Sequence, residues 1–196
     1  MSGGTVDLES NLAPLLPLLR RLDHAAAAAD TRAICADVKA ALMEELGQGR
    51  VPMPEPFLQP VPTGYARRRL FLDPKGRFSV VVMVWGPGQG TPLHDHAGHW
   101  CVECVYDGRI RVTSYDRERE DQGRILFRQR GTVLSDIGAA GALIPPFEYH
   151  TIENPFDTKA VTLHVYEGEL TWCNAFEPLE PAGWFRPQRH ELGYSA

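Results

Sequence analysis

The feature that most constrains the fold is a series of short apolar runs separated by glycine and proline. The run from Phe78 to Trp85 is rich in β-branched and aromatic residues, as buried strands are. Similar runs follow at intervals of roughly 10 residues. They are Val102 to Tyr106, Ile110 to Tyr115, Ile125 to Phe127, Leu143-Ile144 and Ala160 to Tyr166. The 18 glycines and 16 prolines supply turns between them. This pattern predicts an all-β sandwich or barrel.

The first 50 residues follow a different pattern. Apolar side chains between residues 31 and 46 recur every three to four positions, as on one face of an α-helix. Asp30 or Thr31 can cap the start of this helix, and Gly47 can end it. We expect helical structure from residue 8 to residue 48, packed as a cap on the β-domain. The predicted organisation is one structural unit with a helical extension over residues 1–50 and a β-domain over residues 51–196.

Composition and charge narrow the classes of function. The net charge of −5 gives no basic surface of the kind that nucleic acids require. Leu12 to Leu19 is apolar, but two prolines interrupt it and it is much shorter than the roughly 18 residues of a membrane span. Acidic residues precede it and no small-residue cleavage site follows, so it does not resemble a signal peptide. The four cysteines are too few for a disulfide scaffold. We expect a reduced, cytoplasmic monomer or dimer that binds neither nucleic acid nor membrane.

Two histidines separated by one residue indicate a metal site. Residues i and i+2 of a strand point to the same face, so His94 and His96 can share one metal ion. A third nitrogen must come from elsewhere in the chain. His150 is the best candidate, because it follows a turn and opens a predicted strand.

These residues resemble the two motifs of the cupin superfamily, whose fold is a small β-barrel of the jelly-roll kind. The first motif is matched at Gly88, His94, His96 and Gly108. The second is matched at Pro145, His150 and Asn154, with Phe147 where a glycine is usual. Cys101 stands at the position of the usual glutamate ligand. This substitution leaves three neutral imidazoles, which keep coordination positions open for an anionic substrate and for dioxygen.

A longer stretch, from about Tyr65 to Phe176, resembles the cysteine dioxygenase family. The resemblance is carried by Gly76–Phe78, Val84–Gly86, His94–His96 and Cys173–Phe176. It implies that the three histidines bind one ferrous ion per chain. It also implies that a thiol substrate binds this metal, and that both atoms of dioxygen end on its sulfur to give a sulfinate.

The Ser-x-His-x-Tyr motif of that family reads Thr162, His164 and Tyr166 in this chain. These positions share one strand face, so their polar groups can form a hydrogen-bonded row. Some members of the family join this tyrosine through a thioether to a cysteine at the position of Cys101. The resemblance therefore implies a Cys101–Tyr166 crosslink, and the alternative is a buried free cysteine that packs as a small apolar side chain.

A carboxylated substrate requires a cation, and arginine offers a planar bidentate one. Counting from Gly76–Phe78 places Arg68 at the carboxylate-binding position of the family. Arg68 also shares strand parity with Leu70, which indicates that it points inward. Arg67 takes the role if the register shifts by one residue. Some relatives that prefer 3-mercaptopropionate carry glutamine at this position, so the resemblance favours L-cysteine as the thiol.

Several alternatives accompany this interpretation. Within the same class, the substrate can be 3-mercaptopropionate or mercaptosuccinate. A cupin isomerase or decarboxylase would need a carboxylate near the metal for proton transfer. Glu103 and Glu148 are the nearest in sequence, and neither stands at a ligand position of the motifs. A metal-binding cupin that is not an oxygenase would tolerate the loss of a histidine ligand, and all three are present. The prediction is a thiol dioxygenase.

Overall fold

The computed structural model describes residues 13–49 and 51–196. Two α-helices, α2 (Leu16–Ala25) and α3 (Thr31–Gly47), and two short 3-10 helices, η1 (Ala13–Leu15) and η2 (Glu55–Leu58), precede the strands. The strands are β1 (Ala66–Leu72), β2 (Phe78–Trp85), β3 (Cys101–Asp107), β4 (Arg109–Asp121), β5 (Arg124–Asp136), β6 (Ala140–Leu143), β7 (His150–Glu153), β8 (Ala160–Glu167), β9 (Trp172–Leu179) and β10 (Trp184–Glu191).

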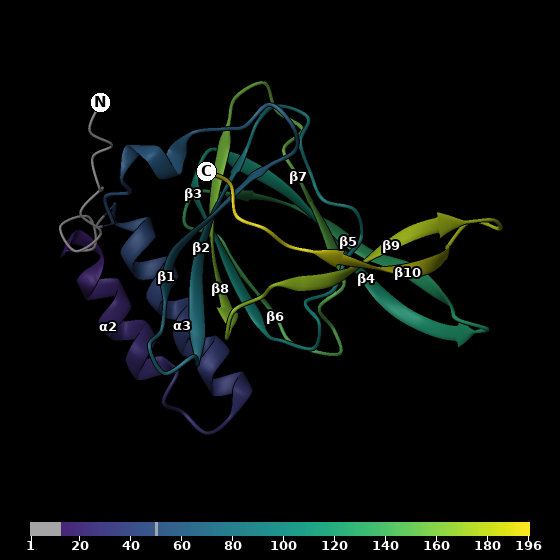
Figure 1. Cartoon of the computed structure of the whole chain (residues 1–196), viewed down its shortest axis with the longest axis horizontal. Coiled ribbons are helices and arrows are strands. Elements are labelled where there is room, and N and C mark those ends of the chain that lie inside the picture. The colour runs from purple at the N-terminus through teal and green to yellow at the C-terminus, as the bar shows by residue number, and fades with distance from the viewer. Residues whose placement is uncertain (1–12, 50) are drawn as a thin grey trace.

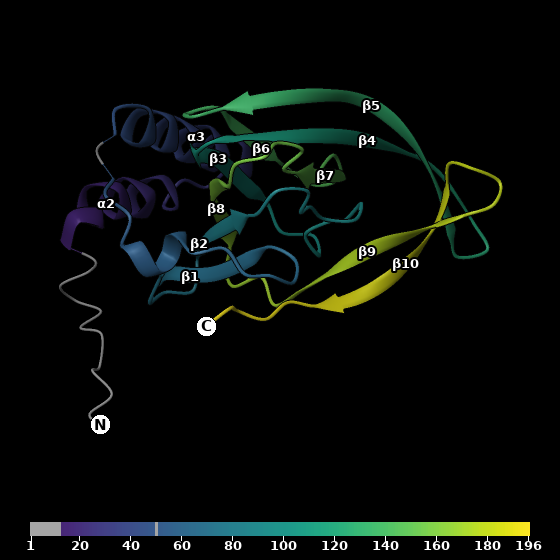
Figure 2. The same cartoon turned by 90° about the horizontal axis from the view of Figure 1, so that it is seen from above.

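The strands form two antiparallel five-stranded sheets. Their orders are β1-β2-β8-β3-β6 and β7-β4-β5-β10-β9. The helices cover the outer face of the first sheet, while the hairpins β4–β5 and β9–β10 extend away from the helices (Figures 1 and 2). The prediction of an all-β cupin fold with an N-terminal helical cap is confirmed.

The first sheet is buried on both faces, because its alternate residues enter two different apolar clusters. Phe78, Val80, Val82 and Val84 of β2 pack with the helices, whereas Val81, Met83 and Trp85 pack inside the barrel. The helices thus share a core with the sheet, and the proposed boundary at residue 50 stays a prediction. No helix among residues 13–49 and 51–196 is long and apolar enough to cross a membrane.

The helical region agrees with its prediction only in part. Asp30 caps α3, since its carboxylate accepts a hydrogen bond from the Ala33 amide at 2.9 Å, and the helix ends at Gly47 as expected. A turn and bend over residues 26–30 separate α2 from α3, in agreement with the helix start predicted at Asp30 or Thr31. The predicted helical residues 8–12 lie outside the described residues.

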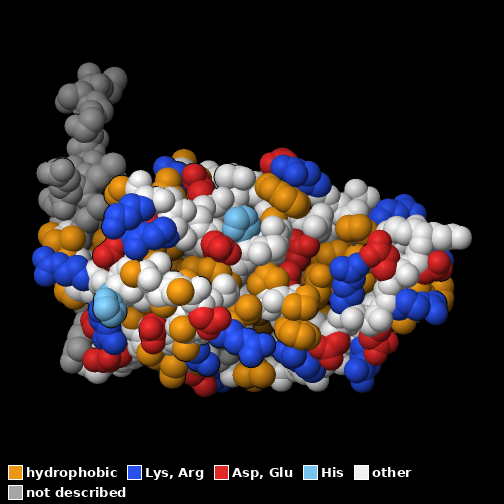
Figure 3. Space-filling view, turned by 90° about the horizontal axis from the view of Figure 1, so that it is seen from below, with side chains coloured by type: hydrophobic (Ala, Val, Ile, Leu, Met, Phe, Trp, Pro, Cys, Tyr) orange, Lys and Arg blue, Asp and Glu red, His pale blue; other side chains and the backbone are white. Residues whose placement is uncertain are grey.

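The second sheet is more extensive than its sequence pattern indicates. β4 and β5 each have 13 residues, and the C-terminal half of each strand is largely exposed. Cross-strand ion pairs, such as Arg128 with Glu118 at 2.6 Å, link the two strands. β9 and β10 carry polar residues on an exposed face, so they lack the apolar run that identifies a buried strand. On the face drawn in Figure 3, acidic and basic side chains are interspersed rather than gathered in patches of one sign.

The shared core generates a stability prediction. Leu42 of α3 is fully buried against the sheet, so we expect Leu42→Ala to lower the free energy of unfolding by about 2–5 kcal/mol. The neighbouring Met43 is 45% exposed, and Met43→Ala should change it by less than about 0.5 kcal/mol. Urea denaturation followed by circular dichroism measures both. Equal effects of the two substitutions would contradict the packing of α3 on the sheet.

Candidate metal centre and its cavity

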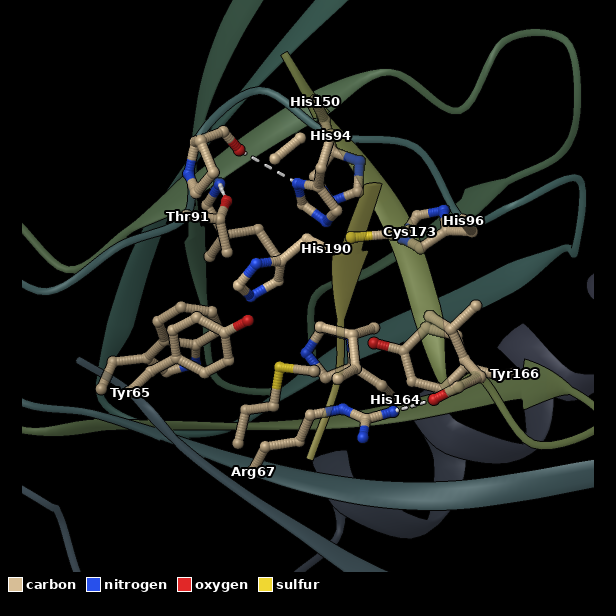
Figure 4. Close-up of a pocket in the computed structure, with 17 residues that line it drawn as sticks. Tyr65, Arg67, Thr91, His94, His96, His150, His164, Tyr166, Cys173 and His190 are labelled. Carbon is tan, nitrogen blue, oxygen red and sulfur yellow. Dashed lines mark hydrogen bonds between the residues drawn. The ribbon is translucent and has the colours of Figure 1, made fainter. Parts of the chain in front are cut away.

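A cavity of about 120 Å³ lies inside the barrel, lined by residues from both sheets. It is large enough for several water molecules, or for one small organic molecule. Arg67 and five histidines line it, and Figure 4 shows their side chains converging from several elements. Among the described residues, no aspartate or glutamate lines this cavity. The walls therefore suit an anionic ligand better than a cationic one.

Three of these histidines point their rings at one place. One ring nitrogen each of His94, His96 and His150 lies within 4.8 Å of the others (Figure 4). Nδ1 of His94 donates to the Pro92 carbonyl oxygen at 3.1 Å, and Nδ1 of His150 donates to that of Glu148 at 2.8 Å. Because these carbonyls only accept, both protons are on Nδ1 and both Nε2 lone pairs are free for a metal.

His94 and His96 lie in the loop between β2 and β3, not in a regular strand as expected. His94 makes only isolated bridges, to His150 and to Ala175. Asp95 holds the loop against β9, because its carboxylate accepts from the backbone amide of Asn174 at 2.9 Å and from its side-chain amide at 2.7 Å. The residue between the histidines thus orients them, in place of strand geometry.

Two residues of the cupin motifs, Gly108 and Asn154, are explained by the fold itself. Gly108 adopts a φ of +72°, and a Cβ there would meet the Lys159 carbonyl oxygen at 2.7 Å, so the β3–β4 turn requires glycine. The buried side-chain amide of Asn154 donates to the carbonyl oxygens of Trp85 at 3.0 Å and Thr158 at 2.8 Å. It joins the end of β7 to β2 and so supports the strand that begins with His150.

The three imidazoles are held in the neutral form that binds metals. Burial lowers the pKa of His94 below its ordinary value. It lowers the pKa values of His96 and His150 much further, and repulsion between the neighbouring rings adds to this. Nδ1 of His96 is buried without a hydrogen-bond partner. A neutral three-imidazole donor set fits ferrous iron, and it fits zinc, copper and nickel as well.

The predicted row of polar residues on β8 has an additional member on β2. The Trp85 indole donates to Thr162 Oγ1 at 2.9 Å, and Thr162 Oγ1 lies 2.7 Å from His164 Nε2. The fully buried Thr162 hydroxyl has no other acceptor among the described residues, so its O–H donates to His164 Nε2, which places the proton of that ring on Nδ1. Burial lowers the pKa of His164 to about 3, so the ring is neutral. The His164 ring also stacks on that of Tyr166, with centroids 5.8 Å apart.

Cys101 and Tyr166 are direct neighbours across β3 and β8. Side chains at such positions have Cβ atoms about 4.5–5.5 Å apart and are therefore in contact range. Cys101 Sγ also lies 3.9 Å from His164 Nδ1. Cys104, three residues further on, packs on the helical side of the sheet, so the two cysteines form no paired site.

The structure places Arg67, not Arg68, in the cavity. Arg67 lies opposite Met83, which faces the barrel, and its Nη2 donates to the Leu170 carbonyl oxygen at 2.7 Å. Arg68 lies opposite Val82, on the face that the helices cover, and donates to the Gln59 carbonyl oxygen at 2.6 Å. The expectation that Arg68 points inward is therefore wrong. Its parity with Leu70 was read correctly, but Leu70 belongs to the helical core and not to the barrel interior.

Sequence reasoning missed His190 of β10, which lines the cavity (Figure 4). Tyr65, two residues before Arg67, lines it as well, and its ring stacks on that of Trp85 with centroids 4.6 Å apart. His190 pairs with Cys173 across β9 and β10, within the family segment Cys173–Phe176. A prediction of the β9–β10 hairpin would have placed His190 beside Cys173. The exposed strands of this hairpin lack the apolar pattern from which a buried strand is predicted.

Comparisons with known proteins agree with these features. A family model described as cysteine dioxygenase type I matches residues 57–178. The cysteine dioxygenase type 1 of Rattus norvegicus is 25% identical over 111 residues, and that of Homo sapiens 27% over 119 residues, in each case over 56% of this chain and 54% of the relative. The chain thus spans about half the length of the curated relatives it matches.

Solved structures show more distant similarity. The protein TT1209 from Thermus thermophilus gives a TM-score of 0.46 at 19% identity, over 58% of this chain and 92% of that one. A Cupin 2 conserved barrel domain protein from Salinispora arenicola CNS-205 gives 0.42 at 20% identity, over 59% and 85%. The relationship is shown by the family match, which covers more than half of the residues. This chain belongs to the cysteine dioxygenase type I family.

Proposed function

We propose that the protein is a thiol dioxygenase that converts a small carboxylated thiol, L-cysteine foremost, into its sulfinate. One ferrous ion per chain would be held by His94, His96 and His150. The thiolate sulfur loses four electrons to dioxygen and keeps both oxygen atoms, so the reaction needs no other oxidant. The observation that supports this most directly is a buried, unpaired arginine, Arg67, in the same cavity as the three histidines.

Arg67 is only 4% exposed, and its Nε is buried without a hydrogen-bond partner. Its guanidinium donates only to backbone carbonyl oxygens, those of Leu170 at 2.7 Å and Gly193 at 3.4 Å, and packs over the Tyr194 ring at 4.6 Å. Within the described residues, no carboxylate forms an ion pair with it. A buried cation without a counter-ion is costly, so a substrate carboxylate would stabilise both itself and the arginine.

The other residues that line the cavity affect which thiol can bind. The absence of acidic groups among the described lining residues favours an anionic substrate, and it gives a substrate amino group no ionic partner there. L-Cysteine remains the leading candidate, because an arginine at the carboxylate position favours it within the family. 3-Mercaptopropionate and mercaptosuccinate, which carry no amino group, are the alternatives that an assay must separate.

Each residue of the site has a task in this proposal. Ferrous iron, when bound, would supply the redox chemistry by which dioxygen reacts with a thiolate. Arg67 would orient the substrate through its carboxylate. Burial holds the pKa of Tyr166 well above its usual range, so the phenol keeps its proton and can donate a hydrogen bond to substrate or oxygen. Thr162 and His164 would hold that phenol in place from the same strand.

The metal assignment is tested by removing one ligand at a time. We expect the purified protein to contain iron, and His94→Ala, His96→Ala and His150→Ala each to abolish iron binding and activity, since two imidazoles hold the ion poorly. His99→Ala is the matched control, because His99 is partly exposed beside Glu167. Elemental analysis and anaerobic Fe²⁺ titration measure the loss. Wild-type iron content in His150→Ala would rule out this site.

The role of Arg67 is tested by oxygen consumption on a panel of thiols. Arg67→Ala should lower kcat/KM for the carboxylated substrate by roughly 30- to 1,000-fold, the cost of about 2–4 kcal/mol for one charge-assisted contact. Cysteamine, which lacks the carboxylate, should respond little. Arg68→Ala, one residue along the same strand, should stay close to the wild type. If Arg68→Ala shows the loss and Arg67→Ala does not, the carboxylate does not bind in this cavity.

The pairing of Cys101 with Tyr166 generates a further prediction. Tyr166→Phe should lower kcat by about 10- to 100-fold, because a positioned proton donor is lost. Cys101→Ala should have a smaller effect, since a thioether would only hold the ring in place. Intact mass spectrometry of denatured, reduced enzyme should show a species lighter by two hydrogens after turnover. A single unmodified mass, together with full activity of Tyr166→Phe, would refute both roles.

A further inference from the structure

Glu103 is a buried carboxyl group beside the candidate metal centre, and the proposed reaction gives it no task. It lies in the middle of β3, directly opposite His164 of β8, and is 5% exposed. Cys101, two residues earlier on the same strand, faces the barrel interior. Glu103 shares this face, one step further along the strand from the position at which the cupin motif carries its glutamate.

One oxygen of Glu103 has no partner. Oε2 is buried without a hydrogen bond, 3.8 Å from His150 Nε2 and 3.7 Å from His164 Nδ1. Both distances exceed a hydrogen bond. A buried carboxylate without partners is costly, and native structures rarely keep one without a reason.

The protons on the neighbouring rings decide what Glu103 can do. His150 carries its proton on Nδ1, so its Nε2 and Glu103 Oε2 present two electron-rich atoms to one another. This arrangement is repulsive when both atoms are unprotonated, and a cation bound beside them relieves the repulsion. His164 also carries its proton on Nδ1, directed to the side on which Oε2 lies, so a small approach would make that contact a hydrogen bond.

We propose that Glu103 is the anionic positioning residue of the metal centre. After a small approach its carboxylate accepts a hydrogen bond from His164 Nδ1, and it adds a negative charge beside His150 Nε2, which strengthens the binding of a divalent cation. It is not one of the donor atoms that converge within 4.8 Å, so it acts from outside the ligand set. Outer carboxylates of this kind typically raise metal affinity by about 10- to 100-fold. The inference rests on the proposed three-histidine centre.

Co²⁺ binding tests this without recourse to activity. Glu103→Gln keeps the shape and removes the charge, so it should raise the Co²⁺ dissociation constant by about 10- to 100-fold and shift the visible absorption of the bound ion. Glu45→Gln is the matched control, because Glu45 is equally buried at 5% exposure but lies in α3, paired with Arg21. It should bind Co²⁺ as the wild type does.

A thermal melt separates this role from a merely structural one. Without metal, Glu103→Gln should melt at or above the wild-type temperature, since a buried unpaired charge is gone. With Co²⁺, it should gain less than the wild type, because ligand stabilisation follows the dissociation constant. If Glu103→Gln does not fold, Glu103→Met fills the same space and is expected to give the same result.

Unchanged Co²⁺ affinity in a folded Glu103 variant would overturn the inference and leave the three-histidine centre intact. Equal Co²⁺ binding by the wild type and His150→Ala would instead overturn that centre, and the inference with it.

Discussion

The double burial of the first sheet is the constraint on which the site depends. Helices α2 and α3 cover one face, so every strand of that sheet must send alternate side chains into an apolar core and into the barrel. On β8, this alternation places Val161, Leu163 and Val165 toward the helices. Thr162, His164 and Tyr166 then have no direction left but the barrel interior. The same packing that stabilises the fold therefore isolates the polar row from water, lowers the pKa of His164 and holds Tyr166 protonated.

Alternation also explains where prediction from sequence succeeds and where it fails. Phe78–Trp85 was predicted with its observed bounds, because a strand buried on both faces is a continuous apolar run. The same double burial explains why Arg68 was chosen wrongly over Arg67. Arg68 and an apolar neighbour of the same parity lie on one face of the strand, but the sequence does not reveal whether that face points to the helices or to the barrel interior. Only the register of β1 on β2, with Arg67 opposite Met83, settles the question. β9 and β10 escaped prediction because their exposed faces carry no apolar pattern.

The candidate site divides along similar lines. Residues whose chemistry is local to a motif could be predicted, among them the three histidines and the Thr162–Tyr166 row. Residues that arrive by long-range pairing could not. Trp85 meets Thr162 across a strand pair, His190 arrives on an unpredicted hairpin, and Glu103 meets His150 through the approach of the two sheets. Glu103 was set aside because it stands at no ligand position of the motif. A residue can nevertheless lie beside a metal site in space without occupying a motif position.

Charge balance links these residues to one another. A divalent cation on three neutral imidazoles would, together with the Arg67 guanidinium, bring three positive charges into a buried space, which low-dielectric surroundings penalise. The thiolate and the carboxylate of the proposed substrate would neutralise two of them. The Glu103 carboxylate, which does not line the cavity, would neutralise the third. Loss of the motif glutamate at Cys101 thus would not leave the centre without an acidic residue. It would move the negative charge one step along β3, out of the ligand set, and leave the position opposite Tyr166 to a thiol.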